Sequence, residues 1–283
     1  MKKLMILGTA SSVGKSIMVA GILRALSNRG LRVAPFKSQN MSRFSKKIDG
    51  LEMSLAQAFQ AKAARQRPHV DMNPILLKPK TDNGSEVILR GQKIGEMDAR
   101  TYFKEKERLM PLVLDAFESL GSIADIVIIE GAGSPAEINL RSMDIVNLGL
   151  ADAIGANALL VGDVDRGGVF ASLFGTYFIL PERDRRHIKG FIINKFRGDV
   201  SLLMPGVESI SQMTGLKSYG VMPYLRDMLV DDEDSAGDKK LGEKRMADYP
   251  KEQHERLLDD EFNRLADAVE KNLDVDGLLE LLS

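Results

Sequence analysis

A doubly wound α/β fold with a mostly parallel sheet is predicted by three features of the sequence. Apolar runs of strand length recur along the chain, and most of them do not alternate with polar residues, which is typical of strands buried on both faces. Segments of helical periodicity separate these runs, and such alternation is typical of parallel α/β proteins. The expected strands are residues 4–7, 33–36, 126–129, 158–161, 191–193 and 219–222, and the clearest expected helices are residues 54–64, 99–120 and 169–180.

The first expected strand runs directly into a loop rich in glycine and serine, and a helix-like segment follows the loop. Backbone N–H groups in such a loop form an anion site, while a lysine reaches the outer phosphates and a serine hydroxyl binds Mg²⁺. Five residues, not the usual four, separate the two glycines, but the strand before and the Lys-Ser pair after favour a nucleotide site over a simple turn. The expected nucleotide ligands are Gly8, Thr9, Ser12, Val13, Gly14, Lys15 and Ser16.

Composition narrows the class of protein. The chain has 283 residues, of which 44% are hydrophobic, so it can bury a substantial core. Its formal charge of −1 provides no basic field for nucleic acid or an anionic membrane. Cysteine is absent, which excludes disulfides, thiolate metal sites and a cysteine nucleophile from this chain. No apolar run approaches a membrane span, and the first strand leaves no room for a signal peptide, so we expect a cytoplasmic enzyme.

Two further regions depart from the alternating pattern. Residues 72–98 predict an extended insertion with a hairpin. After residue 229 an acidic and then mixed-charge stretch predicts a mobile linker. Beyond it, apolar residues at steps of three and four predict an amphipathic helix that docks on the core; they are Leu258, Phe262, Leu265, Val269 and Leu273.

Three side chains, two of them near predicted strand ends, are candidates for phosphoryl-transfer chemistry. Glu130 ends a buried strand beside glycines, where it can share Mg²⁺ with Ser16, and its alternative is a helix-capping or solvated glutamate. Lys37 ends the second strand and can neutralise charge on a transferring phosphoryl group, although a lysine there is often simply solvated. Asp49 precedes an expected helix and could supply a third oxygen near Mg²⁺ or orient a substrate group; its alternative is an Asp-Gly turn and helix cap.

Two loops later in the chain could contact the nucleotide or the substrate. Asp163, Asp165 and Arg166 precede a glycine pair after the fourth strand, a combination that can hold carboxylate or phosphate groups. The alternative is a connecting loop with charges in water. Asn194 follows the fifth strand and could present its amide to a nucleotide base, although an asparagine there is commonly a turn residue.

Five segments together resemble the synthetase domain of the cobyric acid synthase family, which is related to dethiobiotin synthetase. They are residues 8–16, 35–41 (Pro-Phe-Lys-Ser-Gln-Asn-Met), 130–140 (Glu-Gly-Ala-Gly-Ser-Pro-Ala-Glu-Ile-Asn-Leu), 162–172 (Gly-Asp-Val-Asp-Arg-Gly-Gly-Val-Phe-Ala-Ser) and 193–199 (Ile-Asn-Lys-Phe-Arg-Gly-Asp). The resemblance covers about residues 1–236. It implies a synthetase domain over 1–236, a charged linker over 237–256 and a helical tail over 257–283.

The resemblance also implies the chemistry. It implies ATP-dependent amidation of peripheral carboxylates on a corrin ring, with adenosylcobyrinic acid a,c-diamide as the acceptor. Lys15, Ser16 and Glu130 would serve ATP and Mg²⁺, Lys37 the transferred phosphoryl group, and Asn194 the adenine. Substrate contacts are expected from Gln39, Asn40, Ser134, Asp163, Asp165 and Arg166. The substrate carboxylate would attack the γ-phosphate, and ammonia would then displace phosphate, so no protein nucleophile is needed.

The sequence departs from the family pattern in the part that would supply ammonia. Family members normally continue into a glutaminase domain with a catalytic cysteine, and this chain contains no cysteine. We therefore expect free ammonia or a separate glutaminase subunit as partner. Which carboxylates of the corrinoid are amidated stays open. Whether two copies of the chain form a dimer with a shared site stays open as well.

Other functions also stay open. One alternative is another dethiobiotin-synthetase-like enzyme that phosphorylates a different small acid. Another is a partitioning ATPase, although such proteins place a signature lysine early in the loop, where this chain has Thr9 and Ala10. A third is a homologue that binds nucleotide without catalysis.

Overall fold

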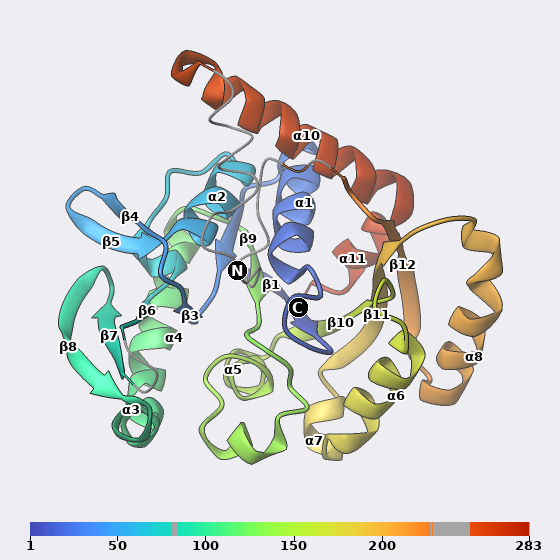
Figure 1. Ribbon diagram of the computed structural model, residues 1–283, viewed down its shortest axis with the longest axis horizontal. Helices are drawn as coiled ribbons and strands as arrows, with labels where there is room; N and C mark the ends of the chain where they lie inside the picture. The colour runs from blue at the N-terminus through green and yellow to red at the C-terminus, as the bar shows by residue number, and fades with distance from the viewer. Residues whose placement is uncertain (81–83, 227, 229–249, 283) are drawn as a thin grey trace.

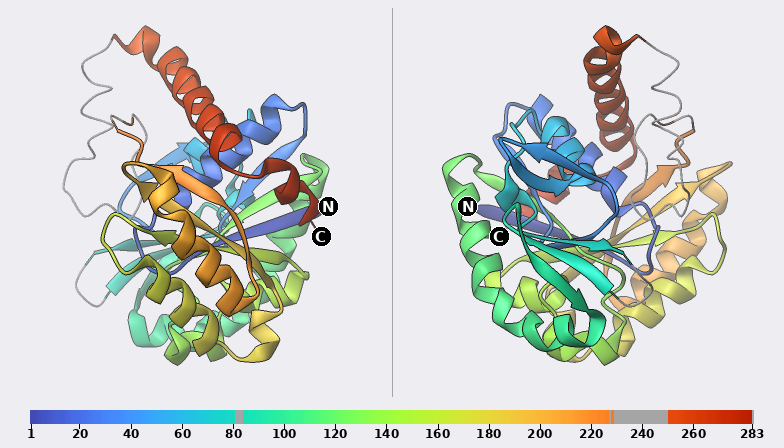
Figure 2. Two further views of the ribbon diagram at one scale, coloured as in Figure 1. Left: turned by 90° about the vertical axis from the view of Figure 1, so that its right-hand side faces the viewer. Right: turned by 60° about the vertical axis from the view of Figure 1, so that its left-hand side comes forward.

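A parallel six-stranded sheet lies between two layers of helices in the computed structural model, which describes residues 1–80, 84–226, 228 and 250–282 (Figures 1 and 2). Its strand order is β12-β11-β10-β1-β9-β2. The strands are β1 (Lys2–Gly8), β2 (Val33–Phe36), β9 (Ile126–Glu130), β10 (Asn157–Asp163), β11 (Ile188–Phe196) and β12 (Lys217–Pro223). The doubly wound fold and all six expected strands are therefore confirmed.

Helices cover both faces of this sheet, which explains why its strands are apolar along their whole length. On β1, Leu4 and Ile6 face one side and Met5 and Leu7 the other. The first side is covered by α1 (Lys15–Asn28), α10 (His254–Asn272) and α11 (Val275–Glu280), with α2 (Leu55–Ala63) beside α1. The second is covered by α4 (Met110–Ser119), α5 (Leu148–Ile154), α6 (Val169–Ile179) and α8 (Met204–Thr214), with the short α7 (Glu182–Arg185) near α5.

The insertion after α2 forms a second, smaller sheet. Its strands β6 (Ile75–Pro79), β7 (Gly84–Leu89) and β8 (Gln92–Asp98) are antiparallel, which confirms the expected hairpin. The short strand β3 (Gln39–Met41) joins β6 in parallel and ties this sheet to the end of β2. A separate hairpin is formed by β4 (Ser45–Ile48) and β5 (Leu51–Ser54).

The helix expected over residues 99–120 is wrong as a single element. The structure has α3 (Ala99–Glu105), a 3₁₀ turn η2 (Lys106–Leu109) and then α4, which starts at Met110 with Pro111 in its first turn. Proline lacks a backbone N–H and fixes its φ angle, so it fits the first turn of a helix and disfavours the interior. The break buries the side chain of Lys106.

The expected docking helix is confirmed. α10 lies across α1 (Figure 1) and buries Leu258, Phe262, Leu265 and Val269. Gly21 on α1 makes this approach close, because a Cβ there would lie 2.9 Å from Val269 Cγ2. The expected linker falls mostly outside the described residues. None of the helices that the structure describes has the length and apolar character needed to cross a membrane.

Candidate active site

The loop after β1 has the backbone of a phosphate site. Gly14 has φ +94°, and a Cβ there would collide with Asn194 Nδ2, so only glycine fits. At Gly8 a Cβ would lie 2.8 Å from Ala10 O. α1 begins at Lys15, so its first N–H groups face the loop, as an anion site requires.

Two side chains from the end of β11 hold this loop in place. Asn194 Nδ2 donates to Val13 O at 2.9 Å. Lys195 Nζ donates to Ser12 O and forms an ion pair with Asp163 Oδ2 at 3.0 Å. Lys195 itself has φ +64°, which is uncommon for a residue other than glycine. Asn194 thus lies at the loop, where its amide N–H₂ is bonded to the loop backbone, and Lys195 is a loop contact that sequence reasoning missed.

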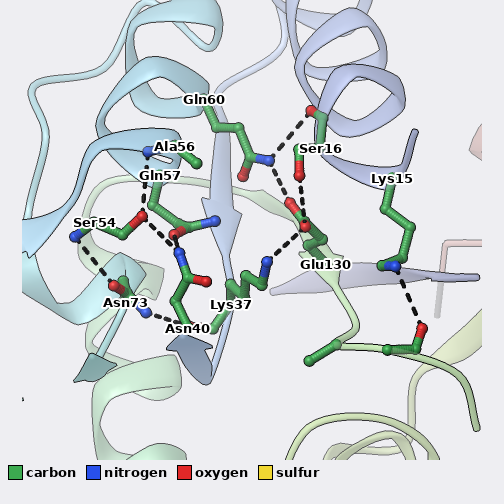
Figure 3. A network of polar contacts seen from close by, with 12 residues as sticks. Lys15, Ser16, Lys37, Asn40, Ser54, Ala56, Gln57, Gln60, Asn73 and Glu130 are labelled. Carbon is green, nitrogen blue, oxygen red and sulfur yellow. Dashed lines mark hydrogen bonds and ion pairs between the residues drawn. The ribbon is translucent and has the colours of Figure 1, made fainter. Parts of the chain in front are cut away.

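Glu130 is the centre of a buried polar cluster (Figure 3). Its Oε1 accepts from Ser16 Oγ and from Lys37 Nζ, both at 2.8 Å, and its Oε2 accepts from Gln60 Nε2 at 2.5 Å. Glu130 is 1% exposed and Lys37 5%. A buried carboxylate requires such partners, because desolvation penalises its charge. The structure therefore brings together three of the expected residues, Ser16, Lys37 and Glu130.

The oxygen atoms of Ser16 and Glu130 fit a Mg²⁺ ion. Mg²⁺ prefers hard oxygen donors and usually takes one or two protein ligands together with substrate phosphates and water. The two side chains supply a hydroxyl and a carboxylate that already lie 2.8 Å apart beside the phosphate loop. These are the residues that would hold the metal.

Asp49 does not join this cluster. It lies in the turn between β4 and β5, where Ile48 pairs with Leu51, and its exposed carboxylate pairs with Arg67 at 2.6 Å. Asp49 and Gly50 both have positive φ angles, +51° and +83°. Asp-Gly favours this two-residue hairpin turn, so the placement agrees with the turn alternative, and Asp49 is left out of the proposed metal site.

A network of hydrogen bonds around Asn40 lies beside the Glu130 cluster (Figure 3). Asn40 Nδ2 donates to Ser54 Oγ at 2.6 Å and to Gln57 Oε1 at 2.7 Å, and Ser54 caps the N-terminus of α2. Asn73 Nδ2 donates to Lys37 O at 3.1 Å. Next to this network, Gln39 Oε1 accepts from Tyr102, whose pKa is raised by burial. Asn40 therefore positions α2, which carries Gln60 to Glu130.

A cavity of about 400 Å³ opens beside the phosphate loop. It brings together five expected site residues: Lys15, Lys37, Gln39, Asn40 and Ser134. Lys15 Nζ lies 3.3 Å from Gly133 O, on the cavity wall. The other lining residues are Ser11, Met41, Lys106, Ala132, Gly133, Pro135, Glu137, Leu140, Arg141, Asp144, Val146 and Asn147.

Several of these residues were missed by sequence reasoning. Lys106, Arg141 and Asn147 come from turns whose place depends on tertiary packing. Gln60, which contacts Glu130 and lies outside this lining, was also missed. It had a weak signal, because two glutamines three residues apart, Gln57 and Gln60, lie on an otherwise apolar helix face.

The expected substrate residues Asp163, Asp165 and Arg166 lie elsewhere. Lys195 pairs with Asp163, and Arg197 pairs with Asp165 at 2.7 Å. Arg166 is mostly exposed, with Nε 4.0 Å from Asp163 Oδ2. Within the part of the chain that the structure describes, these three residues are outside the lining of the cavity. They lie at the end of β10, on the side of the loop that Lys195 holds.

Comparisons with known proteins show which family the chain resembles. A family model described as CobQ/CobB/MinD/ParA nucleotide binding domain matches residues 4–234. The cobyric acid synthase of Desulforudis audaxviator is 54% identical over 235 residues, which cover 83% of this chain and 47% of that protein. The cobyric acid synthase of Aliivibrio fischeri is 51% identical over 239 residues, 84% of this chain and 48% of that protein. The chain thus spans about half the length of the curated relatives it matches.

Among solved structures, the MinD cell division protein of Aquifex aeolicus is 15% identical. The superposition covers 94% of this chain and 97% of that chain, with a TM-score of 0.44.

Proposed function

Since the chain belongs to the CobQ/CobB/MinD/ParA nucleotide-binding domain family, we propose that it uses ATP to convert carboxylates of a corrinoid to amides. The observation that carries the proposal is the Ser16–Glu130–Lys37 cluster, because it lies between the phosphate loop and the cavity. The identity with cobyric acid synthases supports a corrinoid acceptor, adenosylcobyrinic acid a,c-diamide being the form expected.

In the first step, a carboxylate oxygen of the acceptor attacks the γ-phosphorus of ATP. A new C–O–P linkage forms, the bond to the bridging oxygen breaks, and ADP leaves. The phosphate loop holds the nucleotide in line, and the charges of Lys15 and Lys37 stabilise the transferring phosphoryl group. Mg²⁺ bound by Ser16 and Glu130 would neutralise phosphate charge.

In the second step, ammonia attacks the acyl carbon. The C–O bond to phosphate breaks, inorganic phosphate leaves with the bonding electrons, and the nitrogen loses a proton to give the amide. No group of the protein becomes covalently attached, so the absence of cysteine in this sequence is compatible with the reaction. We propose that the ammonia is free or comes from a separate glutaminase.

The position of the cavity supports attack by the acceptor at the phosphate loop. Lys15 and Lys37 both line it, so a carboxylate that enters meets the end of the phosphate loop. Burial of both lysines, at 3% and 5% exposure, strengthens their electrostatic effect relative to water.

The test is turnover by the purified chain. Mg²⁺-ATP and cobyrinic acid a,c-diamide are supplied with ammonium chloride or with glutamine, ADP is measured, and the corrinoid products are weighed by mass spectrometry. Amidated corrinoid from ammonia but not from glutamine is expected. ATP binding without corrinoid-dependent ADP release would instead support a non-catalytic homologue, and ADP release with another small acid would support a different carboxylate-activating enzyme.

A further inference from the structure

A buried lysine, Lys106, lines the cavity and has no role in the proposed chemistry. It comes from the 3₁₀ turn η2 between α3 and α4 and is only 7% exposed. Its ammonium faces the ring of Phe103, with Nζ 5.6 Å from the ring centroid. Lysine is rarely buried without an anionic partner, because removing its charge from water is costly.

The other cations of the cavity are already engaged. Lys15 Nζ lies against Gly133 O, Lys37 pairs with Glu130, and Arg141 forms a two-pronged ion pair with Asp184. Lys106 differs from them. None of the side chains that the structure describes forms a hydrogen bond or an ion pair with its ammonium.

Two carboxylates line the cavity together with Lys106, but their oxygens accept hydrogen bonds from backbone N–H groups. Asp144 accepts from the N–H groups of Val146 and Asn147 at 3.0 and 2.7 Å, and Glu137 accepts from that of Ser134 at 3.3 Å. Burial lowers the pKa of Lys106, and the charges of Asp144 and Glu137 act in the opposite direction. Both acids thus favour the ammonium form without occupying its hydrogen-bonding positions.

We propose that Lys106 binds a second carboxylate of the acceptor, one that is not being activated. This inference rests on the proposed function, since it assumes an acceptor with several peripheral carboxylates. Lys15 and Lys37 lie at the phosphate loop and the Glu130 cluster, whereas Lys106 comes from a different element of the cavity wall. A desolvated ammonium forms strong, charge-assisted hydrogen bonds with a carboxylate.

The size and lining of the cavity favour binding of acceptor side chains. A volume of about 400 Å³ suits carboxylate-bearing arms, with the macrocycle at the mouth. Met41, which is 61% exposed, and the half-buried Leu140 offer apolar surface to such a ring. Two anchored carboxylates would fix which arm reaches the phosphate, so Lys106 would act as a specificity-determining residue.

The experiment compares Lys106→Met, Lys106→Arg and the matched control Lys104→Met, an exposed lysine two residues earlier on α3. Dissociation constants for cobyrinic acid a,c-diamide are measured by equilibrium dialysis with Mg²⁺ and a non-hydrolysable ATP analogue present. The same proteins are tested with a neutral methyl ester of the corrinoid. Affinity for the ATP analogue and circular dichroism report the integrity of the fold, and Lys106→Gln replaces Lys106→Met if the latter does not fold.

We expect Lys106→Met to weaken binding of the acid by about thirtyfold or more, because one partner of a buried charge pair is removed. Lys106→Arg should retain most of the affinity, and the ester should bind wild type and Lys106→Met equally. The ATP analogue should bind all variants alike. Equal affinity of Lys106→Met and wild type for the acid would overturn the inference, as would a loss confined to the ATP analogue.

A failure of the proposed function would give a different binding result from a failure of the Lys106 inference. Wild type would then bind the ATP analogue but not the corrinoid. The comparison would be repeated with citrate as the polycarboxylate probe, and equal citrate binding by wild type and Lys106→Met would overturn the carboxylate-binding role of Lys106 by itself.

Discussion

Lys37 donates a 2.8 Å hydrogen bond to Glu130 in the interior of the protein, from the position that directly follows the neighbouring strand β2. Both side chains are almost fully buried. Glu130 also accepts from Ser16, whose hydroxyl belongs to the first turn of the helix after the phosphate loop. The pair therefore couples a cation at the cavity wall to the oxygen atoms proposed to hold Mg²⁺.

Replacement of Lys37 tests this relationship. Lys37→Met removes positive charge from the transferring phosphoryl group, so we expect kcat for corrinoid amidation to fall by about 100-fold or more. Affinity for ATP should change much less, because the loop supplies most phosphate contacts. Steady-state kinetics with ammonia and nucleotide titration separate the two effects. Lys47→Met, an exposed lysine on β4, is the control, and a kcat for Lys37→Met within twofold of it would argue against a catalytic role.

Lys195 should act on nucleotide binding by holding the phosphate loop. Lys195→Met removes the contacts with Ser12 O and Asp163, so we expect the KM for ATP to rise by about tenfold, equivalent to one charged hydrogen bond. The effect on kcat should be smaller. Lys189→Met, an exposed lysine on the same strand, should behave as wild type. A fall in kcat with an unchanged KM would show that Lys195 does not act through the loop.

The C-terminal helix should contribute to the stability of the nucleotide-binding core. Phe262 on α10 is 1% exposed and packs under the buried guanidinium of Arg24, with Cζ 5.3 Å from its ring centroid. Phe262→Ala should lower the free energy of unfolding by about 3–5 kcal/mol. Urea denaturation measures this change, with the exposed Asp267→Ala on α10 as control. Equal unfolding midpoints for the two variants would mean that α10 is not docked in solution.

Asp71 should make a pH-dependent contribution to the free energy of unfolding. Burial raises the pKa of its carboxyl, but hydrogen bonds from Arg90 and Ser119 outweigh this effect, so the pKa is lowered from its ordinary value of 3.8. A lowered pKa stabilises the fold above pH 3.8, and this contribution is lost as pH falls through the folded-state value.

The matching variant is Asp71→Asn. At pH 7 it should lose about 2–3 kcal/mol of unfolding free energy, and the difference from wild type should shrink below about pH 3. Asp115→Asn removes the exposed partner of the same arginine and should cost less than about 1 kcal/mol. Denaturation at several pH values measures both. A difference for Asp71→Asn that is independent of pH would contradict the assignment.

Much of the fold was predictable because its signals are local. The strands of the central sheet are buried on both faces, so they read as continuous apolar runs, and the loop from Gly8 to Ser16 carries its chemistry in adjacent residues. Glu130 and Lys37 were predictable for a related reason. The carboxyl ends of parallel strands meet at one edge of the sheet, so residues at those ends are brought together.

The remaining features depend on contacts that a linear pattern does not contain. Asp49-Gly50 was compatible with a ligand or with a turn, and the pairing of β4 with β5 selects the turn. Gln60 meets Glu130 only because Asn40 and Ser54 fix α2. Lys106 lies in the 3₁₀ turn that interrupts the helix before Pro111, and periodicity alone predicted an unbroken helix there.

In the proposed mechanism a substrate carboxylate attacks ATP directly. A corrinoid whose carboxylates are labelled with ¹⁸O, turned over with ammonia and Mg²⁺-ATP, tests this attack by mass spectrometry of the released phosphate. An acyl phosphate transfers one labelled oxygen to phosphate for every amide formed. Amide formation accompanied by unlabelled phosphate would contradict the mechanism proposed for the Ser16–Glu130–Lys37 cluster.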